Sequence, residues 1–213
     1  MIKAIIFDYD GVIVDSFPTI HNVYQIICDK LNKNCPKEFL DFQIAYGLNS
    51  RIFLRNLGFS QEEIKKADVI YKNEIHKQDP NFFLNIDKVI INLSKKYKLF
   101  LVSSNLFDEV KNKLGKIGIF KFFNKIVAGK LGPMKKTVEI INLLKEEKLN
   151  PKEVIIIGDR VNDYHDAKGA GIENIILVEY GWGYNKNDIP EHVQKVGVNK
   201  PEDILLAINE IDK

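Results

Sequence analysis

The stretch IIFDYDGVIVDS, residues 5–16, decides the fold. Its apolar residues run to Phe7 and are followed by two aspartates, Asp8 and Asp10, with one residue between them. A short, continuous apolar run is typical of a parallel strand that is covered on both faces. The two carboxylates at its end need a chemical reason, because neighbouring like charges disfavour each other's ionisation.

Similar short apolar runs recur along the chain. With residues 4–7, they occupy residues 99–102, 125–128, 154–157 and 175–178. Between these runs, apolar residues recur at helical spacing, as Ile140, Leu143 and Leu144 do. The alternation from about residue 87 onward predicts an α/β fold with a doubly wound, mainly parallel, Rossmann-like sheet.

Residues 15–85 have no comparable strand pattern, and they are far too many for an ordinary crossover. They predict a helical domain inserted after the first strand, so that residues 1–14 and 86–213 form the α/β core. We expect hinges near residues 14–18 and 79–84. The expected helices of the insert cover residues 21–31, 37–46, 50–57 and 61–77, the last preceded by a capping box of Ser60 and Glu63.

The composition is that of a globular chain. The 213 residues are 45% apolar and 28% charged, and the net charge is only +2. Acidic and basic residues are dispersed, so we expect neither a nucleic-acid partner nor a membrane partner. The first apolar run is too short for a signal peptide or a membrane span.

Cysteine is rare in this chain. Cys28 and Cys35 are its two cysteines, and two thiols do not make a disulfide framework for a chain of this size. We therefore expect a reducing compartment, the cytoplasm. No apolar stripe marks an interface, so a monomer and a homodimer both stay open.

Polar residues follow the ends of the first, second and fourth expected strands. They are Asp8 and Asp10, then Ser103, Ser104 and Asn105, then Asp159 and Asp163. Ligands of doubly wound sheets bind outside the carboxyl ends of the strands, so these side chains are expected at one site. Several carboxylates fit Mg²⁺, whereas no His or Cys is present there for zinc. The alternative interpretation is a set of separate turn acids and helix caps.

Three of these segments resemble motifs of the haloacid dehalogenase-like hydrolases. DYDGVIVDS resembles the first motif in its phosphatase form, VSSN the second and GDRVND the fourth. The run AKGAGIENIILVEYGWG is similar to phosphoglycolate phosphatase-like members. The helical insert looks like the first type of cap in this family, which phosphoglycolate phosphatase-like and beta-phosphoglucomutase-like members share.

The resemblance implies a Mg²⁺-dependent phosphatase that hydrolyses a small soluble phosphomonoester through an aspartyl-phosphate. Asp8 is then the nucleophile, and Asp10 protonates the leaving oxygen, activates water and offers its backbone carbonyl to the metal. Ser103 would hydrogen-bond the transferring phosphoryl group. The implied Mg²⁺ ligands are Asp8, Asp10, Asp159 and Asp163.

The third motif of the family is a lysine that pairs with the nucleophile, and here it is ambiguous. Lys136 fits best, because the apolar residues that follow it then fall at the helix phase seen where the family uses a lone lysine. Lys135 and Lys130 stay open. The common Lys-Pro-x-Pro form is absent from this stretch.

Substrate selectivity is expected from residues around the site entrance. Ser104 and Asn105 follow Ser103 directly, and in the insert Gly47 and Arg51 lie in or beside a turn. Arg51 is a candidate for binding a second anionic group on the substrate. The plainer interpretation is a turn glycine and a surface arginine.

Other functions share parts of this pattern. A beta-phosphoglucomutase-type phosphotransferase uses the same motifs but returns the phosphoryl group to a sugar. A dehalogenase lacks the second acid of the Asp-x-Asp pair, whereas Asp10 is present. A receiver-like signalling domain and a non-catalytic binding module are the remaining alternatives.

Overall fold

The computed structural model describes residues 1–47, 50–75, 77–79, 81–129, 134–188 and 197–213. The chain divides into two compact units: Met1–Asp15 with Phe82–Lys213, called here the α/β unit, and Ser16–Asn81, called here the helical unit. The helical unit ends before the expected boundary at residue 85. The reason is that Phe82 and Phe83 pack against the core of the α/β unit.

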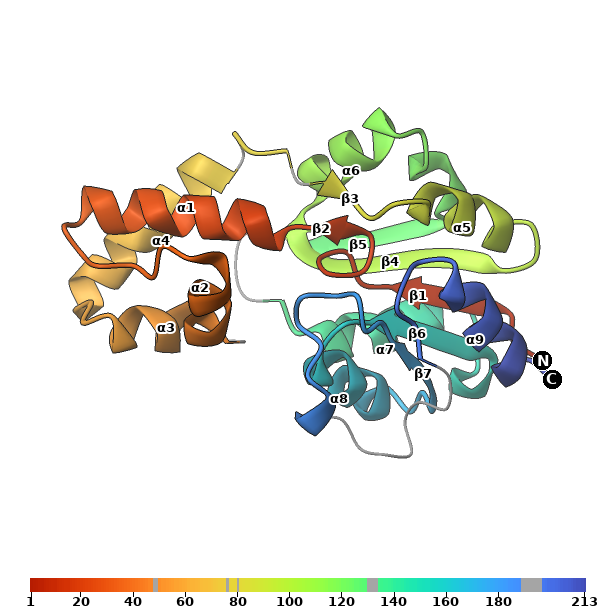
Figure 1. Ribbon diagram of the computed structural model, residues 1–213. Helices are drawn as coiled ribbons and strands as arrows, with labels where there is room; N and C mark the ends of the chain where they lie inside the picture. The colour runs from red at the N-terminus through yellow and green to blue at the C-terminus, as the bar shows by residue number, and fades with distance from the viewer. Residues whose placement is uncertain (48–49, 76, 80, 130–133, 189–196) are drawn as a thin grey trace. The chain divides into compact units, whose positions relative to one another are not determined.

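A parallel sheet forms the centre of the α/β unit (Figure 1). In the described part of the chain it has five strands in the order β5-β4-β1-β6-β7. They are β1 (Ala4–Phe7), β4 (Lys98–Leu106), β5 (Lys125–Gly129), β6 (Val154–Gly158) and β7 (Asn174–Leu177). Ile5 of β1 pairs with Leu99 on one side and with Ile155 on the other, both in parallel register. The prediction of a parallel α/β sheet is confirmed.

Helices cover both faces of this sheet, as the alternation of side chains along β1 shows. Ile5 and Phe7 belong to one hydrophobic core, and Ala4 and Ile6 belong to the other. The first core includes residues of α5 (Ile86–Leu93), α6 (Phe107–Lys116) and α9 (Asp203–Ile211). The second includes residues of α7 (Lys136–Glu146) and α8 (Val161–Gly169). The doubly wound arrangement is therefore as expected.

Short elements complete the α/β unit. Three 3₁₀ turns are found among the described residues: Phe120–Phe122, Pro151–Glu153 and Lys186–Asp188. A further pair of strands, β2 (Val14–Asp15) and β3 (Asn81–Phe82), forms a two-stranded sheet. The sequence did not predict this pair, because two residues are too few to show an alternating pattern.

The helical unit is built around an aromatic cluster. Its helices are α1 (Phe17–Lys30), α2 (Phe39–Tyr46), α3 (Ser50–Asn56) and α4 (Gln61–Ile75). Phe42 is fully buried, and its ring packs against those of Phe17, Tyr46 and Phe53 at centroid distances of 5.6, 5.5 and 5.1 Å. Edge and offset contacts of this kind add stability beyond the burial of apolar area.

Two helix starts of this unit are informative. Before α4, the backbone N–H of Ser60 donates to Glu63 Oε2 (2.7 Å) and that of Glu63 donates to Ser60 Oγ (3.2 Å), which confirms the predicted capping box. Helix α1 begins at Phe17, four residues earlier than expected. Pro18 lies in its first turn, where a missing N–H leaves no hydrogen bond unmade.

Cys28 of α1 and Cys35 are paired as a disulfide within the helical unit. The sequence did not predict this pairing, because two cysteines seven residues apart do not make a disulfide framework for a chain of this size. Because disulfides are rare in reducing compartments, this pairing gives no support to the expected cytoplasmic location.

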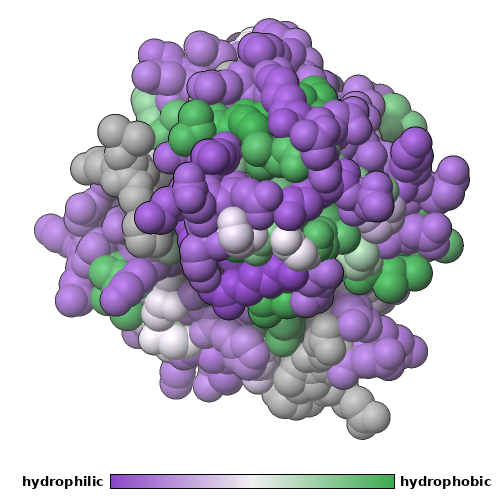
Figure 2. All heavy atoms as spheres, turned by 90° about the vertical axis from the view of Figure 1, so that its left-hand side faces the viewer, coloured by the Kyte–Doolittle hydropathy of each residue, from purple (hydrophilic) through white to green (hydrophobic). Residues whose placement is uncertain are grey.

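Large hydrophobic side chains are exposed at several places on the described surface. Figure 2 shows one face of the molecule, where green hydrophobic residues occur in several separate groups among purple hydrophilic ones. The helical unit contributes some of the large exposed apolar side chains, namely Phe39, Leu40, Ile44, Ile52 and Val69. Of the helices within the described ranges, none combines the length and hydrophobicity that crossing a membrane requires.

Asp212 joins the two ends of the α/β unit. Its Oδ1 accepts from the backbone N–H of Ile2 (2.6 Å), and its Oδ2 accepts from Tyr97 Oη (2.9 Å) and from Lys96 Nζ (2.8 Å). The side chain is 4% exposed. The hydrogen bonds from Lys96 and Ile2 lower the pKa of Asp212 to about 2. This carboxylate is therefore more strongly stabilised in the folded chain than in the unfolded chain.

We expect Asp212→Asn to lower the free energy of unfolding by about 2 kcal/mol at neutral pH, since hydrogen bonds to a charged group are lost. The pKa is lower in the folded chain, so the contribution is complete above about pH 4 and disappears as the pH falls toward 2. Urea unfolding over this range should show the two proteins converging at acidic pH. Glu210→Gln, which removes an exposed ion pair with Lys213, is the matched control and should change little. A constant difference at every pH would contradict this account.

Candidate active site

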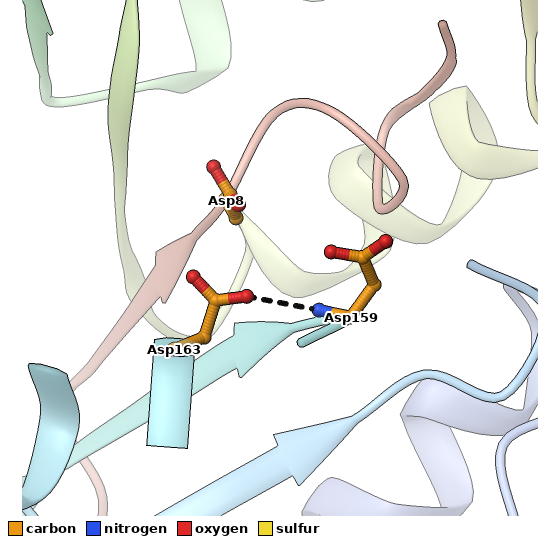
Figure 3. Close-up of side chains that lie close together, drawn as sticks. All are labelled: Asp8, Asp159 and Asp163. Carbon is orange, nitrogen blue, oxygen red and sulfur yellow. Dashed lines mark hydrogen bonds between the residues drawn. The ribbon is translucent and has the colours of Figure 1, made fainter. Parts of the chain in front are cut away.

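Three carboxylates lie together at the carboxyl end of the parallel sheet. Asp8 follows β1, Asp159 follows β6, and Asp163 lies in the first turn of α8. Each of the three offers one carboxylate oxygen, and these three oxygens lie within 4.8 Å of one another. Among the described residues, this is the one group of His, Cys, Asp or Glu side chains that is close enough together to hold a metal ion. Figure 3 shows the three side chains coming from these elements toward a common space. The parallel strands β1 and β6 bring together Asp8 and Asp159, which are 151 positions apart in the chain, at the strand ends where the sequence predicts a shared site.

Lys136 lies between two of these carboxylates. Its Nζ is 2.8 Å from Asp8 Oδ2 and 3.2 Å from Asp163 Oδ1. Burial alone would lower the pKa of Lys136, but the charges of Asp8 and Asp163 raise it above its ordinary value. The ammonium group therefore stays charged. Of the two candidate lysines for the third motif that the structure describes, Lys135 and Lys136, it is Lys136 that pairs with Asp8.

Burial dominates the electrostatics of Asp8. Its side chain is 11% exposed, and its Oδ1 accepts from the backbone N–H of Tyr9 at 2.7 Å. Burial raises the pKa of Asp8 to about 7, although the positive charge of Lys136 acts in the opposite direction. The nearby carboxylates of Asp163 and Asp10 raise it further. One lysine does not compensate all the negative charge that the site gathers.

Asp159 is completely buried, with 0% exposure. Its Oδ2 accepts from the backbone N–H of Gly183 at 2.8 Å, whereas its Oδ1 has no hydrogen-bond partner among the described residues. Burial raises the pKa of Asp159 to about 8, which Arg160 partly opposes. A buried carboxylate oxygen without a hydrogen bond normally has another partner, such as an ion.

These residues fit a hard divalent cation. The ligand atoms are all carboxylate oxygens, the uncompensated charge is negative, and Asp159 Oδ1 is buried and without a hydrogen bond in the described structure. Mg²⁺ binds through one or two carboxylates together with waters and substrate phosphate. The group contains neither His nor Cys, which zinc would favour.

Asp163 is fixed by the start of its helix. Its Oδ2 accepts from the backbone N–H groups of Asp159 (3.2 Å) and Arg160 (3.1 Å), and the first of these bonds is drawn in Figure 3. The helix dipole favours an acid in this turn. The other oxygen, Oδ1, faces Lys136. The position of Asp163 is thus set by the backbone of the GDRVND segment.

Gly11 allows the loop after Asp10 to approach Asp159. Its φ is +76°, a conformation that side chains disfavour, and a Cβ atom there would lie 2.0 Å from Asp159 Oδ2. The backbone N–H of Gly11 donates to Val14 O at 2.8 Å, which closes the turn. The glycine of the first motif therefore has a steric role in the α/β unit.

Asp10 lies outside the group of three carboxylates. Its Oδ2 accepts from Asn105 Nδ2 at 2.7 Å. Asn105 in turn donates its backbone N–H to Ser103 Oγ (3.1 Å), so the end of β4 orients Asp10. Ser103 is buried, with 1% exposure, and Ser104 is exposed. The structure brings Asp10, Ser103 and Asn105 together, and Asn105 makes a contact that the sequence did not predict.

A cavity of about 510 Å³ opens beside these groups within the α/β unit. Its volume is sufficient for a small phosphorylated metabolite. The residues that line it are Asp8, Asp10, Ser104, Met134, Lys135, Lys136, Thr137, Val138, Arg160, Asn162, Asp163 and Asp166.

The remaining predicted residues are two positions in the helical unit and the two alternative lysines. Arg51 lies in the helical unit, where its Nη2 is 3.1 Å from Asp68 Oδ2. Gly47 ends α2 with a φ of +54°. Lys130 lies outside the described residues. Lys135 lines the cavity and precedes α7. For Gly47 and Arg51, a role in substrate binding stays a prediction.

Sequence reasoning missed Arg160 and Gly183. Arg160 lines the cavity, and Gly183 binds Asp159 through its backbone. Arg160 could have been predicted to lie at the site, because it belongs to the GDRVND segment that supplies Asp159 and Asp163. No sequence pattern could have indicated the hydrogen bond from the backbone N–H of Gly183 to Asp159, because every residue other than proline carries such a group.

Comparison with known proteins gives a family. A sequence profile described as haloacid dehalogenase-like hydrolase matches residues 5–177. A phosphorylated carbohydrates phosphatase of Thermotoga maritima is 28% identical over 221 residues, which cover 98% of this chain and 99% of the relative. A phosphoglycolate phosphatase of Synechococcus elongatus is 24% identical and covers 98% of each chain.

The fold has solved counterparts. A haloacid dehalogenase-like family protein from Streptococcus pneumoniae superposes with a TM-score of 0.85 and 24% sequence identity. The superposition covers 97% of this chain and 98% of the other. The aligned residues include nearly the whole chain, and the likeness establishes the fold.

Proposed function

Because this chain belongs to the haloacid dehalogenase-like hydrolase family, we propose that it is a Mg²⁺-dependent phosphatase that acts through an aspartyl-phosphate on Asp8. Its family and the phosphatase names of its relatives make it a phosphatase. The observation that carries the detailed mechanism is the meeting of Asp8 with Lys136, Asp159 and Asp163.

In the first half-reaction, a carboxylate oxygen of Asp8 attacks phosphorus as the bond to the leaving oxygen breaks. Lys136, 2.8 Å from Asp8 Oδ2, stabilises the negative charge of the carboxylate and of the phosphoryl oxygens. Ser103 supplies a hydroxyl at the end of β4. The chain holds these groups on strand ends and a helix start, so little reorganisation is needed.

Asp10 transfers the protons. It gives a proton to the leaving alkoxide, then takes one from the water that attacks the aspartyl-phosphate, which releases phosphate and restores Asp8. The hydrogen bond from Asn105 keeps the Asp10 carboxyl group apart from the three clustered carboxylates.

The candidate metal ligands are the side chains of Asp8, Asp159 and Asp163 and the backbone carbonyl of Asp10. Mg²⁺ bound there would neutralise the excess carboxylate charge and that of the phosphoryl oxygens. Asp159 Oδ1, buried without a hydrogen bond in the described structure, supports this assignment.

The proposal also covers the helical unit, the substrate, the location and the oligomeric state. We propose that the helical unit is the cap of the family and that Gly47 and Arg51 contribute to substrate selection. The substrate is a small soluble phosphomonoester. The protein acts in the cytoplasm, as a monomer or homodimer, without a nucleic-acid or membrane partner.

Phosphate release from a panel of esters tests this function. The panel includes phosphoglycolate, sugar phosphates, nucleoside monophosphates and an aryl phosphate, each with Mg²⁺ and with a chelator. We expect release that requires Mg²⁺ and is restored when Mg²⁺ is returned after chelation. Equal release in excess chelator would contradict the metal assignment, and no release from any ester would contradict the hydrolase.

A further inference from the structure

Arg160 is a charged residue of the cavity lining that the mechanism above does not use. It caps the start of α8, immediately after Asp159, and its side chain is 23% exposed. It lines the same cavity as Asp8 and Asp10. A guanidinium group is always charged at physiological pH and carries five N–H donors in a plane.

The guanidinium group is held in place by an aromatic ring. Arg160 Cζ lies 3.9 Å from the centroid of the Trp182 ring, well within the range of a cation–π contact. Stacking of this kind covers one face of the guanidinium group and leaves the N–H groups in its plane for other partners. It also reduces the rotamer freedom that a long side chain otherwise loses on binding a ligand.

The loop that carries Trp182 is closely fitted to Asp159 and Arg160. A Cβ atom at Gly181 would lie 2.3 Å from Asp159 Cβ, and one at Gly183 would lie 2.4 Å from Arg160 Cγ. Both distances are shorter than real side chains allow. Glycines on both sides of Trp182 thus let the loop reach Asp159 with its backbone and Arg160 with its ring.

Asp159 does not use the N–H donors of the Arg160 guanidinium group. Arg160 Nε is 3.6 Å from Asp159 Oδ1, which is beyond hydrogen-bond distance and is not the two-bond geometry of a full arginine–carboxylate pair. The contact is electrostatic and lowers the pKa of Asp159. A planar donor group on the cavity wall therefore keeps hydrogen-bonding capacity for a ligand.

We propose that Arg160, positioned by Trp182, is a specificity residue that binds a second anionic group, a carboxylate or a second phosphate, on the phosphomonoester. This inference deepens the proposed phosphatase function and rests on it. The phosphoryl group to be transferred would bind at Asp8 and Lys136, and the second anion would bind the guanidinium group of Arg160 in the same cavity. Substrates with a single phosphate and a neutral remainder lack this contact.

Binding of hydrolysis-resistant phosphonates tests the proposal independently of turnover. We would measure dissociation constants by calorimetry, with Mg²⁺, for phosphonoacetate, propylenediphosphonate and methylphosphonate. The first two carry a second anion, as a carboxylate and as a phosphonate, and the third carries none. The proteins are the unmodified chain, Arg160→Gln, Arg160→Lys, Trp182→Leu and, as a charge-matched control on the same helix, Lys168→Gln, whose side chain is exposed.

We expect the unmodified chain to prefer at least one ligand with two anions over methylphosphonate. Arg160→Gln should weaken that ligand by about 10- to 100-fold, the range for charge-assisted hydrogen bonds, and should change methylphosphonate binding little. Arg160→Lys should restore only part of the preference, because an ammonium group has no planar fork. The stronger of the two dianionic ligands identifies the second anion. Lys168→Gln should bind like the unmodified chain.

Trp182→Leu tests the positioning role. It should weaken the same ligand by a smaller factor, and in turnover it should raise KM for doubly anionic esters while kcat stays similar. Thermal melts of each variant show whether it folds. If Arg160→Gln or Trp182→Leu does not fold, Arg160→Lys, which keeps the charge and most of the bulk, tests the role of Arg160 in its place.

The outcomes separate this inference from the function on which it rests. An unmodified chain without a preference, or an Arg160→Gln variant that weakens all three ligands equally or keeps the preference, would overturn the role of Arg160. A preference that depends on Arg160, in a protein that releases phosphate from no ester, would instead overturn the hydrolase and leave the binding site standing.

Discussion

Replacing Asp8 by Asn is expected to lower phosphate release by at least about a thousand-fold, because the amide cannot act as the nucleophile. The side chain keeps its size, so the loss should come from chemistry and not from misfolding. The backbone N–H of Tyr9 can still donate to the amide oxygen, as it does to Asp8 Oδ1.

The stability of Asp8→Asn should change little. Burial already disfavours the ionised form of Asp8, whose pKa is raised to about 7, so a neutral replacement is tolerated at this position. Lys136 keeps Asp163 as a partner. Initial rates with a saturating ester and a thermal melt check both points. Asp108→Asn, at an exposed position of α6, is the control and should keep full activity. Turnover near the normal rate in Asp8→Asn would refute the nucleophile assignment.

Lys136→Met is expected to have the second largest effect. The ammonium group lies within 3.2 Å of two carboxylates, and a methionine of similar length leaves their charges uncompensated. We expect kcat to fall by about 100- to 1,000-fold, the range for removing one donor that stabilises developing negative charge. The free energy of unfolding should fall by about 3 kcal/mol in the absence of divalent cations, as for other broken buried ion pairs.

Added Mg²⁺ should recover part of that stability. If the cation binds among Asp8, Asp159 and Asp163, it should raise the melting temperature of Lys136→Met more than that of the unmodified chain. Lys135→Met is the comparison, since Lys135 lines the cavity without an ion pair to Asp8 in the described structure. It should lose less than about tenfold in kcat, because a rim charge steers substrates more than it stabilises the transition state. Equal losses in the two variants would contradict the choice of Lys136 as the third-motif lysine.

The fold was predictable where it depends on local sequence patterns, such as repeated apolar runs and helix caps. Continuous apolar runs such as residues 4–7 are typical of strands in a sheet covered on both faces, and β1 does contribute side chains to both cores. The capping box of Ser60 and Glu63 was predictable for the same reason, since its partners are three residues apart. The start of α1 was predicted four residues late, because a hinge was expected at residues 14–18, although Phe17, Ile20 and Tyr24 continue the apolar repeat back to the first residue of the helix.

The site was predictable through its acids, and less so through its neutral groups. A rule about strand ends was enough to expect Asp8, Asp159 and Asp163 near one another. The register of α7 was enough to favour Lys136 over Lys135. The contact between Asn105 and Asp10 and the bond from Gly183 to Asp159 depend on loop geometry that no local pattern encodes. The stacking of Trp182 on Arg160 joins two loops that are distant in sequence, and it too could be found only in three dimensions.

The central claim is that a phosphoryl group passes through Asp8, and trapping this group tests it most directly. The protein would be mixed with a radiolabelled ester and Mg²⁺, quenched in acid within milliseconds to seconds, and digested for peptide mapping. The account predicts an acid-stable, hydroxylamine-sensitive label on the peptide that contains Asp8, which disappears as free phosphate forms and is missing from Asp8→Asn. Phosphate release at a normal rate with no label on Asp8 at any quench time, or a label on another residue, would contradict it.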